Sequence, residues 1–468
     1  MTTIRQMGRI LLTMSVILII MAIFISSEAK AASIPEYIKV GLRFGDNAAS
    51  TYTLSSENGF VLGSITDEGF KETLPLPAYD TLIAIIEGNH IALRDKENVL
   101  ISQDIGKNSC LLPLDYKENG LITFEGNKFR GGIILNTQSN NRIKAINYIT
   151  MDEYLYGVLH KEMSQSYPME ALKAQAVAAR SFAVESIGRH YNDGFDVCTT
   201  TDCQVYGGYE AEYPRTNQAV DETSGLIIWA NGQPAPVFYF KNSGGHTQSI
   251  EDVWLSSNLP HLVGKKDPYS PDYSWIATIT FNSFEQQLIQ AGYDVGSIES
   301  VQVGGRNSAG AVSKLIIKGS KDTLILEKER IRTVLGPSLV RSRHFNIGEV
   351  YMGKNSIVFE IQLMLSNGSK TKNADQNINI ISGDGKIKSI ASESAYITNG
   401  KETVKAKTVE SESKIDDSIV ATGSEVTFSG MGYGHGVGMA QDGAIEMARQ
   451  GYNFIEILKF YFTNIEVR

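Results

Sequence analysis

The chain has 468 residues, 42% of them hydrophobic, 9% aromatic and 20% charged, a balance typical of a globular protein with two or three domains. Its formal net charge of −9 argues against nucleic acid as a partner, because phosphate backbones are bound by clustered Lys and Arg. Three cysteines are too few for a fold built on disulfides.

The first 31 residues have the pattern of an export signal. Arg5 and Arg9 precede an apolar run over 10–25, and Ala29 and Ala31 follow at the spacing that a signal peptidase recognises. The run is close to the shortest length that spans a bilayer, so an uncleaved signal anchor competes with a cleaved signal peptide. We favour the signal peptide and expect the rest of the chain to be exported.

Residues 32–149 are predicted to be rich in β-strands. Short alternating or β-branched runs, such as YIKVGLRF and GGIILN, are separated by Gly, Asn and Asp, which favour turns. Only YDTLIAIIEG leaves helix and strand open.

The pattern changes to helical at residue 150. Thr150 and Glu153 form a capping-box pair, and apolar residues then recur at helical spacing along a face that ends in Glu162. A carboxyl group on an apolar face has a raised pKa, which suits a general acid. The alternative is that Glu162 turns to solvent or pairs with Lys161 or Lys173.

A second helix is predicted from Pro168, which suits a first helical position, through the Ala-rich run ALKAQAVAARSFAVESIGRHY. Its alanines would let another backbone pack closely. Its polar side consists of Lys173, Gln175 and Arg180.

Strands are predicted over 225–239 and 276–326, with NSGGHTQS and VGGRNSAGAV as loops. His246 and Trp254 lie in or near the first loop and are candidates for lining a cleft. After an insertion rich in Ser, Lys and Asn, the chain ends in two helices, AQDGAIEMARQ and FIEILKFYF; Asn453 and Glu456 are the expected cap of the second.

GMGYGHGVGM, residues 430–439, has a glycine at every second position. In a strand this spacing would leave one face bare, while Tyr433 and His435 would point to the other. The bare face would suit a flat sugar ring or close packing against the Ala-rich helix, and both can hold.

Cys198 and Cys203 lie in one short loop, with Asp202 next to the second cysteine and His190 upstream. These four residue types could close a tetrahedral zinc site. In an exported chain the alternative is a disulfide between the two cysteines.

Four motifs occur in an order that resembles the stage II sporulation protein D and amidase-enhancer family. They are MDEYLYGVLHKEMSQSYPMEALKAQAVAARSFAV, CTTTDCQVYGGY, NSGGHTQSIEDVW and GMGYGHGVGMAQDGA. The resemblance covers roughly residues 37–348 and 424–468.

The resemblance implies an exported peptidoglycan lytic transglycosylase that acts on glycan strands stripped of their peptides, in septal wall remodelling during sporulation. Glu162 would be the single catalytic acid and base, and Tyr433, His435, His246, Trp254, Lys173, Gln175 and Arg180 are candidates for binding the glycan. The expected partners are the glycan, a cell-wall amidase and membrane proteins. The same family implies an alternative, a non-catalytic enhancer of an N-acetylmuramoyl-L-alanine amidase.

The resemblance also favours zinc in the cysteine loop. Some relatives bind zinc there with a histidine directly before the second cysteine, where this chain has Asp202. We therefore predict a structural zinc ion held by Cys198, Cys203, His190 and Asp202.

Together these patterns predict an α+β protein: a β-rich platform, an Ala-rich central helix pair, and a C-terminal Gly-rich strand followed by helices. The predicted parts are the signal segment 1–31, the β-rich part 32–149, a catalytic core with the zinc loop 150–348, a polar insertion 349–424, and a C-terminal part 425–468 that completes the core.

Overall fold

The computed structural model describes residues 34–254, 259–348 and 420–468, and six short strands between 361 and 405. The predicted signal segment and most of the predicted insertion lie outside the described residues. Among the described residues, no helix is long and apolar enough to cross a membrane. The chain divides into two compact units, Met1–Phe238 with Gly451–Lys459 and Asn464–Arg468, and Tyr239–Gln450 with Phe460–Thr463.

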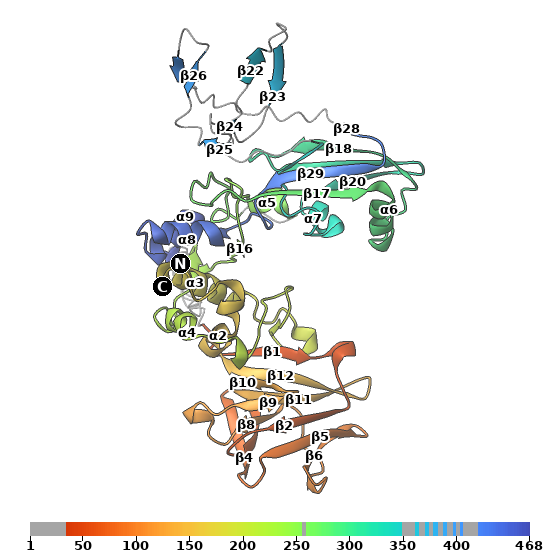
Figure 1. The fold of residues 1–468 in the computed structure, drawn as a ribbon. Coiled ribbons are helices and arrows are strands. Elements are labelled where there is room, and N and C mark those ends of the chain that lie inside the picture. Colours follow the sequence, from red (N-terminus) through yellow and green to blue (C-terminus); the bar gives the residue numbers. More distant parts are fainter. Residues whose placement is uncertain are drawn as a thin grey trace, which may run out of the picture. The chain divides into compact units, whose positions relative to one another are not determined.

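The first unit is built on two sheets (Figure 1). A seven-stranded sheet has the order β13-β1-β12-β11-β8-β3-β4, and a six-stranded sheet has the order β10-β9-β2-β5-β6-β7. The strands are β1 (Tyr37–Arg43), β2 (Thr51–Ser55), β3 (Phe60–Thr66), β4 (Gly69–Leu76), β5 (Thr81–Glu87), β6 (His90–Asp95), β7 (Leu100–Ser102), β8 (Ser109–Pro113), β9 (Ile122–Phe124), β10 (Asn127–Phe129), β11 (Gly132–Gln138), β12 (Arg142–Thr150) and β13 (Val197–Cys198). The predicted β-rich part is therefore confirmed, and YDTLIAIIEG contains the strand β5.

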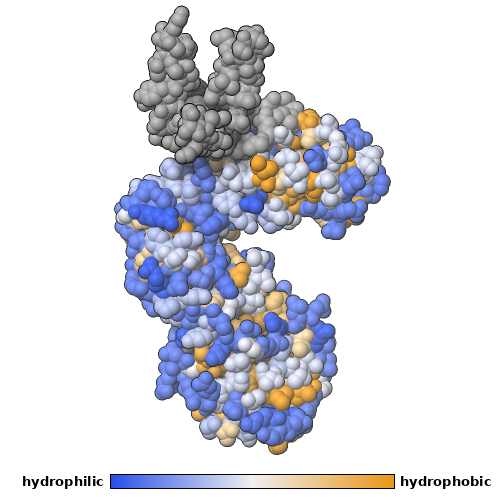
Figure 2. Space-filling model, viewed as in Figure 1, coloured by the Kyte–Doolittle hydropathy of each residue, from blue (hydrophilic) through white to orange (hydrophobic). Residues whose placement is uncertain are grey.

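Apolar side chains of these strands are buried between the elements, as Leu54, Leu82 and Ile146 illustrate. Over the same part of the molecule, the face visible in Figure 2 is mostly hydrophilic or neutral, with apolar residues in small spots. This distribution is that of a folded unit with its own core.

Three helices pack together beside the sheets: α2 (Met151–Glu162), α3 (Met169–Glu185) and α4 (Pro214–Asp221). Thr150 caps α2 as predicted, because its side chain accepts a hydrogen bond from the backbone N–H of Glu153. The Ala-rich helix α3 ends at Glu185, earlier than predicted, and Gly188 soon follows with a left-handed φ of 77°.

The rest of the first unit includes η3 (Tyr191–Asp193), η4 (Tyr209–Ala211) and a small sheet of β14 (Ile228–Ala230), β15 (Gln233–Pro234) and β31 (Glu466–Val467). The last helix, α9 (Phe454–Tyr461), has the predicted capping box. The Asn453 amide N–H donates to Glu456 at 2.9 Å, and the Glu456 amide N–H donates to Asn453 at 3.0 Å.

The second unit has its own apolar core, which includes Phe284, Phe345 and Phe428. Figure 1 shows α6 and α7 on one side of its strands. The elements are β16 (Tyr239–Phe240), α5 (Ile250–Val253), β17 (Ser274–Thr280), α6 (Phe281–Gln290), β18 (Ile298–Arg306), β19 (Val312–Gly319), β20 (Thr323–Glu327), α7 (Arg330–Leu335), β21 (Phe345–Ile347), β28 (Val420–Ala421), β29 (Glu425–Met431), β30 (Met439–Ala440) and α8 (Gln441–Arg449).

The prediction of strands throughout 276–326 was wrong at α6. Phe281, Phe284 and Leu288 lie three and four residues apart and are all buried, so this segment forms a helix with one apolar face. Between 361 and 405 the six strands β22 (Ile361–Met364), β23 (Lys370–Asn373), β24 (Ile378–Ile381), β25 (Ile387–Ile390), β26 (Tyr396–Thr398) and β27 (Thr403–Lys405) pair as three antiparallel hairpins.

The glycine run is not a continuous strand, which corrects the prediction. Strand β29 ends at Met431 and β30 begins at Met439. Between them Gly432, Gly434, Gly436 and Gly438 all have positive φ, from 80° to 120°. Alternating glycines therefore make a series of turns rather than one bare face.

The glycines of this turn segment give room to the loop NSGGHTQS and the strand before it. A Cβ atom on Gly434 would lie 2.7 Å from Cβ of Phe240, and one on Gly436 would lie 2.6 Å from Cγ of Gln248. The close packing predicted against the Ala-rich helix is thus replaced, at these positions, by packing against residues 240–248.

Candidate functional site

Glu162 is the last residue of α2, and its side chain is partly buried. The helix directs Tyr154, Leu155 and Val158 into the core, and all three are fully buried. These apolar contacts hold the helix in place and so fix the position of the backbone from which the Glu162 carboxyl group extends. A carboxyl group between an apolar helix face and solvent suits proton transfer to a bound substrate.

The loop that follows Glu162 is held by an arginine that the sequence analysis did not single out. Arg215, in α4, donates from Nε to the carbonyl oxygen of Gln165 at 2.9 Å and from a terminal nitrogen to that of Tyr167 at 3.1 Å. Arg215 thereby ties the loop 163–168 to α4. The sequence carried no signal for it, because a lone arginine early in a short helix has many possible partners.

His160 precedes Glu162 by two residues and stacks on Tyr213, with the ring centroids 3.9 Å apart. Burial, and then the charge of Lys161, lowers the pKa of His160. Among the described residues, its buried Nδ1 atom has no hydrogen-bond partner. A neutral imidazole therefore packs beside the end of α2.

The three polar residues of α3 do not form a solvent-facing side. Arg180 and Gln175 are fully buried, and Lys173 is partly buried between Glu170 and Glu222, with ion-pair distances of 3.1 and 2.6 Å. The predicted polar side of this helix is therefore corrected. Most of the helix is buried, because α2 and α4 both lie against it.

Arg180 has a structural role in this arrangement. Its guanidinium group donates to the carboxylate of Asp152 at 2.9 and 3.2 Å, and to the carbonyl oxygens of Val220, Thr223 and Leu226 at 2.8 to 3.2 Å. It joins α2, α3 and the end of α4. Arg180 and Gln175 are fully buried, so neither side chain is accessible to a glycan in this structure, contrary to the prediction.

The four predicted metal ligands come together in the first unit. His190, Cys198, Asp202 and Cys203 each place one ligand atom within 4.8 Å of the others. We call residues 190–203, which contain these four ligand candidates, the metal loop. His190 Nε2 is 3.4 Å from Cys203 Sγ and 3.6 Å from Asp202 Oδ2. Tetrahedral zinc, with bonds of about 2.0–2.3 Å, places its ligands about 3.3–3.8 Å apart, so the donor types and these two distances fit the ion, whereas the full set spreads to as much as 4.8 Å.

The surroundings of the metal loop also suit a metal site. Strand β13 pairs in parallel with β1 and fixes Cys198 at the sheet edge, opposite Gly41. The ring of Phe195 stacks on His190 at 4.8 Å, and a Cβ atom on Gly41 would lie 2.6 Å from that ring. His190 Nδ1 is 3.7 Å from an Asp193 carboxylate oxygen, the position of an outer-shell orienting group. Both cysteines of the loop are free thiols.

The other four predicted glycan-binding residues, Tyr433, His435, His246 and Trp254, belong to the second unit. The ring of His435 lies 5.1 Å from Trp254 and 5.5 Å from Phe240. Its Nδ1 accepts the backbone N–H of Val437 at 3.0 Å. Desolvation, followed by the charge of Arg332, lowers the pKa of His435 to about 3, so the ring is neutral at physiological pH.

Tyr433 and His246 lie on the segments that flank the glycine turns. Tyr433 exchanges both backbone hydrogen bonds with Asn242, at 2.8 and 3.0 Å. His246 Nδ1 lies 2.6 Å from the carbonyl oxygen of Thr247. The glycine turns thus place Tyr433, His435 and the loop NSGGHTQS together, while contact with a glycan stays a prediction.

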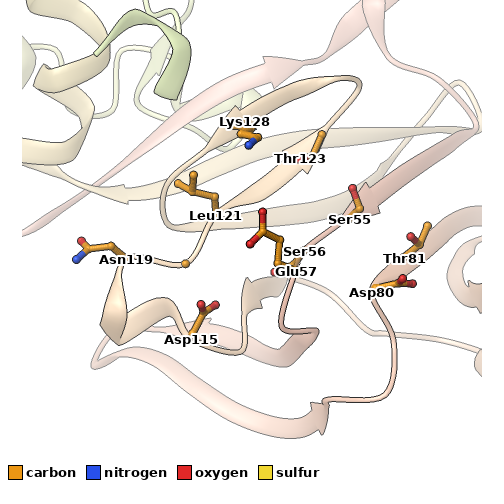
Figure 3. A pocket seen from close by; sticks show the side chains of 11 residues that line it. Ser55, Ser56, Glu57, Asp80, Thr81, Asp115, Asn119, Leu121, Thr123 and Lys128 are labelled. Carbon is orange, nitrogen blue, oxygen red and sulfur yellow. The ribbon is translucent and has the colours of Figure 1, made fainter. Parts of the chain in front are cut away.

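Polar hollows lie in the β platform of the first unit, and two of them differ in charge. One, the acidic hollow, has a volume of about 340 Å3 and is lined by side chains that include Glu57, Asp80, Asp115 and Lys128 (Figure 3). The other, about 400 Å3, lies beside the metal loop and is lined by Asn89, Asn108, Asn136, Lys107 and Tyr191, among others. Neither contains Glu162.

Comparison with known proteins bears on the helix pair and the metal loop. Residues 139–229, which include Glu162 and all four metal-ligand candidates, match the model of the stage II sporulation protein family. These residues therefore carry a domain of that family, and relatives of the chain bear the names amidase enhancer and stage II sporulation protein D. Residues 248–362 also match a domain of unknown function (DUF8618).

Three relatives share this similarity. The amidase enhancer of Bacillus subtilis is 29% identical over 312 residues, which cover 66% of this chain and 39% of the relative. An uncharacterized protein of Brachyspira hyodysenteriae is 29% identical over 74% of each chain. The stage II sporulation protein D of Bacillus subtilis is 25% identical over 69% of this chain and 76% of its own. The chain therefore spans well under half of the amidase enhancer.

Proposed function

We propose that this protein is an exported lytic transglycosylase that cleaves the MurNAc–GlcNAc bonds of peptide-stripped glycan strands in the cell wall, with Glu162 as the catalytic acid and base. The observation that carries the proposal is the position of Glu162: a partly buried carboxyl group at the end of an apolar-faced helix, inside the segment that matches the sporulation family.

The chemistry needs only one carboxyl group. Glu162 in its acid form donates a proton to the bridging glycosidic oxygen, and the bond from that oxygen to C1 breaks. The Glu162 carboxylate then accepts the proton of the sugar's own 6-hydroxyl, and the oxygen of that hydroxyl forms a bond to C1. The product carries a 1,6-anhydro end, and no water is consumed. Enzymes that hydrolyse the bond need a second carboxylate instead.

The surrounding residues position the acid rather than react. Tyr154 and Val158 anchor α2 in the core, and Arg215 fixes the loop after Glu162 through two carbonyl oxygens. In the metal loop, the two thiolates, the imidazole and Asp202 would hold a structural zinc ion, which supplies a closed tetrahedral link and leaves no open coordination position. A cell-wall location and a role in sporulation agree with the names of the relatives.

The test is mass spectrometry of products formed from purified glycan strands without peptides. Wild-type protein is expected to form anhydro-muramyl ends, and Glu162→Gln is expected to lower their rate of formation by at least about a hundredfold, since an amide cannot donate the proton. Glu153→Gln is the matched control, because the same change at the other end of α2 preserves the capping box. Equal cleavage by wild type and Glu162→Gln would remove Glu162 from the mechanism.

A second function is favoured by one comparison, the 29% identity to a protein named amidase enhancer. On this alternative the chain binds glycan or an N-acetylmuramoyl-L-alanine amidase, activates the amidase and cleaves nothing itself. Amidase turnover measured with and without the chain separates the two functions. Stimulation that is equal for wild type and Glu162→Gln, with no anhydro ends from either, would establish the enhancer.

A further inference from the structure

The hollow of about 400 Å3 beside the metal loop is lined by many polar side chains. It is formed by β6, the loop between β7 and β8, strands β11 and β12, and η3. We name it the asparagine hollow, because its lining includes Asn89, Asn108, Asn136 and Asn192. Amide groups both donate and accept hydrogen bonds, which matches the hydroxyl and acetamido groups of an amino sugar.

An exposed aromatic ring borders this hollow. Tyr191 is 82% exposed, the largest value among the exposed large hydrophobic residues of the described chain. A tyrosine ring in this position has given up nearly all burial, although aromatic side chains gain much by it. The flat face of a sugar ring is a fitting partner for such a surface.

The hollow carries two lysines, Lys107 and Lys144, and two carboxylates, Asp104 and Asp193. Lys144 donates to the backbone carbonyl of Asp193, and Asp104 accepts the backbone N–H of Gly106 at 2.8 Å, so both groups are used within the wall. The Asp193 carboxylate is 3.7 Å from His190 Nδ1 on the side of the metal loop. Lys107 is exposed and has no ion pair among the described residues. Its ammonium group is therefore available to pair with an anionic ligand.

We propose that the asparagine hollow is a second glycan-binding subsite, in which Tyr191 stacks on a sugar ring and Lys107 pairs with the lactyl carboxylate of an unsubstituted muramic acid. The proposal rests on the proposed function. Removal of the peptide by an amidase turns an uncharged lactyl amide into a carboxylate, so a cation here would distinguish stripped strands from peptide-bearing ones.

The acidic hollow has an excess of negative charge. Its wall carries the carboxylates of Glu57, Asp80 and Asp115 against the single amine of Lys128 (Figure 3), so it opposes an anionic sugar. Tyr79 and Lys96 line an adjoining hollow that shares Glu57 and Asp80. These two residues provide matched controls for Tyr191 and Lys107, because they lie on the same unit in acidic surroundings.

The test is binding of fluorescently labelled strands to the full chain carrying Glu162→Gln, which prevents cleavage during the measurement. Tyr191→Ala is expected to weaken binding of stripped strands about fivefold, the size of one aromatic contact. Lys107→Ala is expected to weaken the binding of stripped strands about threefold and to leave the binding of peptide-bearing strands unchanged. Tyr79→Ala and Lys96→Ala are expected to bind like the parent.

Unchanged binding by both Tyr191→Ala and Lys107→Ala, with thermal melting equal to that of the parent, would overturn the subsite. So would an equal loss with Lys107→Ala on stripped and peptide-bearing strands, since the lactyl carboxylate would then have no role. Cleavage of short soluble glycan fragments by the Tyr191→Ala variant with Glu162 intact reports on the proposed function alone. The two proposals can therefore fail separately.

Discussion

The helix framework of α2, α3 and α4 and the metal loop, which lies between α3 and α4 in the sequence, belong to the same unit but are held by different means. In the framework, buried Arg180 makes five hydrogen bonds, to one carboxylate and three backbone carbonyl groups. In the metal loop, regular structure is limited to η3, with three residues, and β13, with two. The loop instead gathers four ligand atoms within 4.8 Å.

The two regions therefore obtain their geometry from different interactions. The framework is complete within the chain, because the Arg180 charge is paired and all its donor groups are directed at oxygen atoms. The metal loop brings thiol, imidazole and carboxylate groups together with only long ion pairs of 3.4–3.7 Å, so on the zinc proposal its geometry would depend on the ion. Glu162 lies at the end of the complete framework, which suits its proposed role as a catalytic acid.

Loss of Arg180 should break the framework and have the largest effect on stability. Arg180→Ala leaves Asp152 and three carbonyl groups without their donor and is expected to lower the free energy of unfolding by about 3–5 kcal/mol. Lys173→Ala, in the same helix, is the control, because it removes only partly exposed ion pairs worth about 1 kcal/mol or less. Urea denaturation measures both. Equal stability of the two variants would mean that Arg180 does not hold the framework.

Loss of the metal should loosen the loop and spare the framework. Cys203→Ser, or a chelator, is expected to remove one zinc ion per chain, measured by elemental analysis. It is also expected to lower stability by about 3 kcal/mol, the effect of a ligand at a hundred times its dissociation constant.

Cys110→Ser is the control, because Cys110 is buried in β8, away from the loop. Retention of zinc by Cys203→Ser would contradict the assignment. A mass 2 Da below that of the dithiol would instead establish the disulfide, since its formation releases two hydrogen atoms.

Acid should release the ion before it affects the framework. Burial raises the pKa of the Cys203 thiol to about 11, so the metal-free loop keeps this proton at neutral pH. Zinc must displace it, and the affinity is expected to fall about tenfold for each pH unit below neutrality through this group alone. Competition with a chromophoric chelator at pH 8, 7 and 6 measures the slope. A zinc affinity independent of pH would exclude a thiolate ligand.

The smallest expected effect concerns the start of α2. Thr150→Ala removes the side-chain oxygen that accepts the Glu153 amide and is expected to cost about 1 kcal/mol of stability. Thr150→Ser keeps that oxygen and is expected to match the wild type. A loss of similar size in both variants would show that the methyl group, rather than the cap, stabilises the helix.

Local patterns predicted the framework well. The capping pairs Thr150 with Glu153 and Asn453 with Glu456 lie within four residues of each other, so their hydrogen bonds follow from the sequence. The candidate metal ligands lie within fourteen residues of sequence, and this short separation keeps them close in space. The apolar face that leads to Glu162 is likewise a local property of α2.

Features that depend on distant contacts were not predictable in this way. The turns at Gly434 and Gly436 exist because Phe240 and Gln248 approach them, nearly two hundred residues away in the sequence. The sequence predicted Arg180 on the polar side of a helix. In the structure, carbonyl oxygens of α4 and of the residues that follow α4 accept hydrogen bonds from Arg180 and bury it. The helix α6 was missed although Phe281, Phe284 and Leu288 carried its period, because the surrounding strand runs dominated the segment.

In the proposed mechanism the MurNAc–GlcNAc bond is broken by intramolecular attack, with Glu162 as the only acid and base. The most direct measurement is digestion of peptide-stripped glycan strands in water enriched in 18O, followed by mass spectrometry of the new ends. The account predicts anhydro-muramyl ends without 18O from the wild type, and none from Glu162→Gln. New reducing ends that contain 18O would contradict it, because water would then be the nucleophile and a second carboxylate would be required.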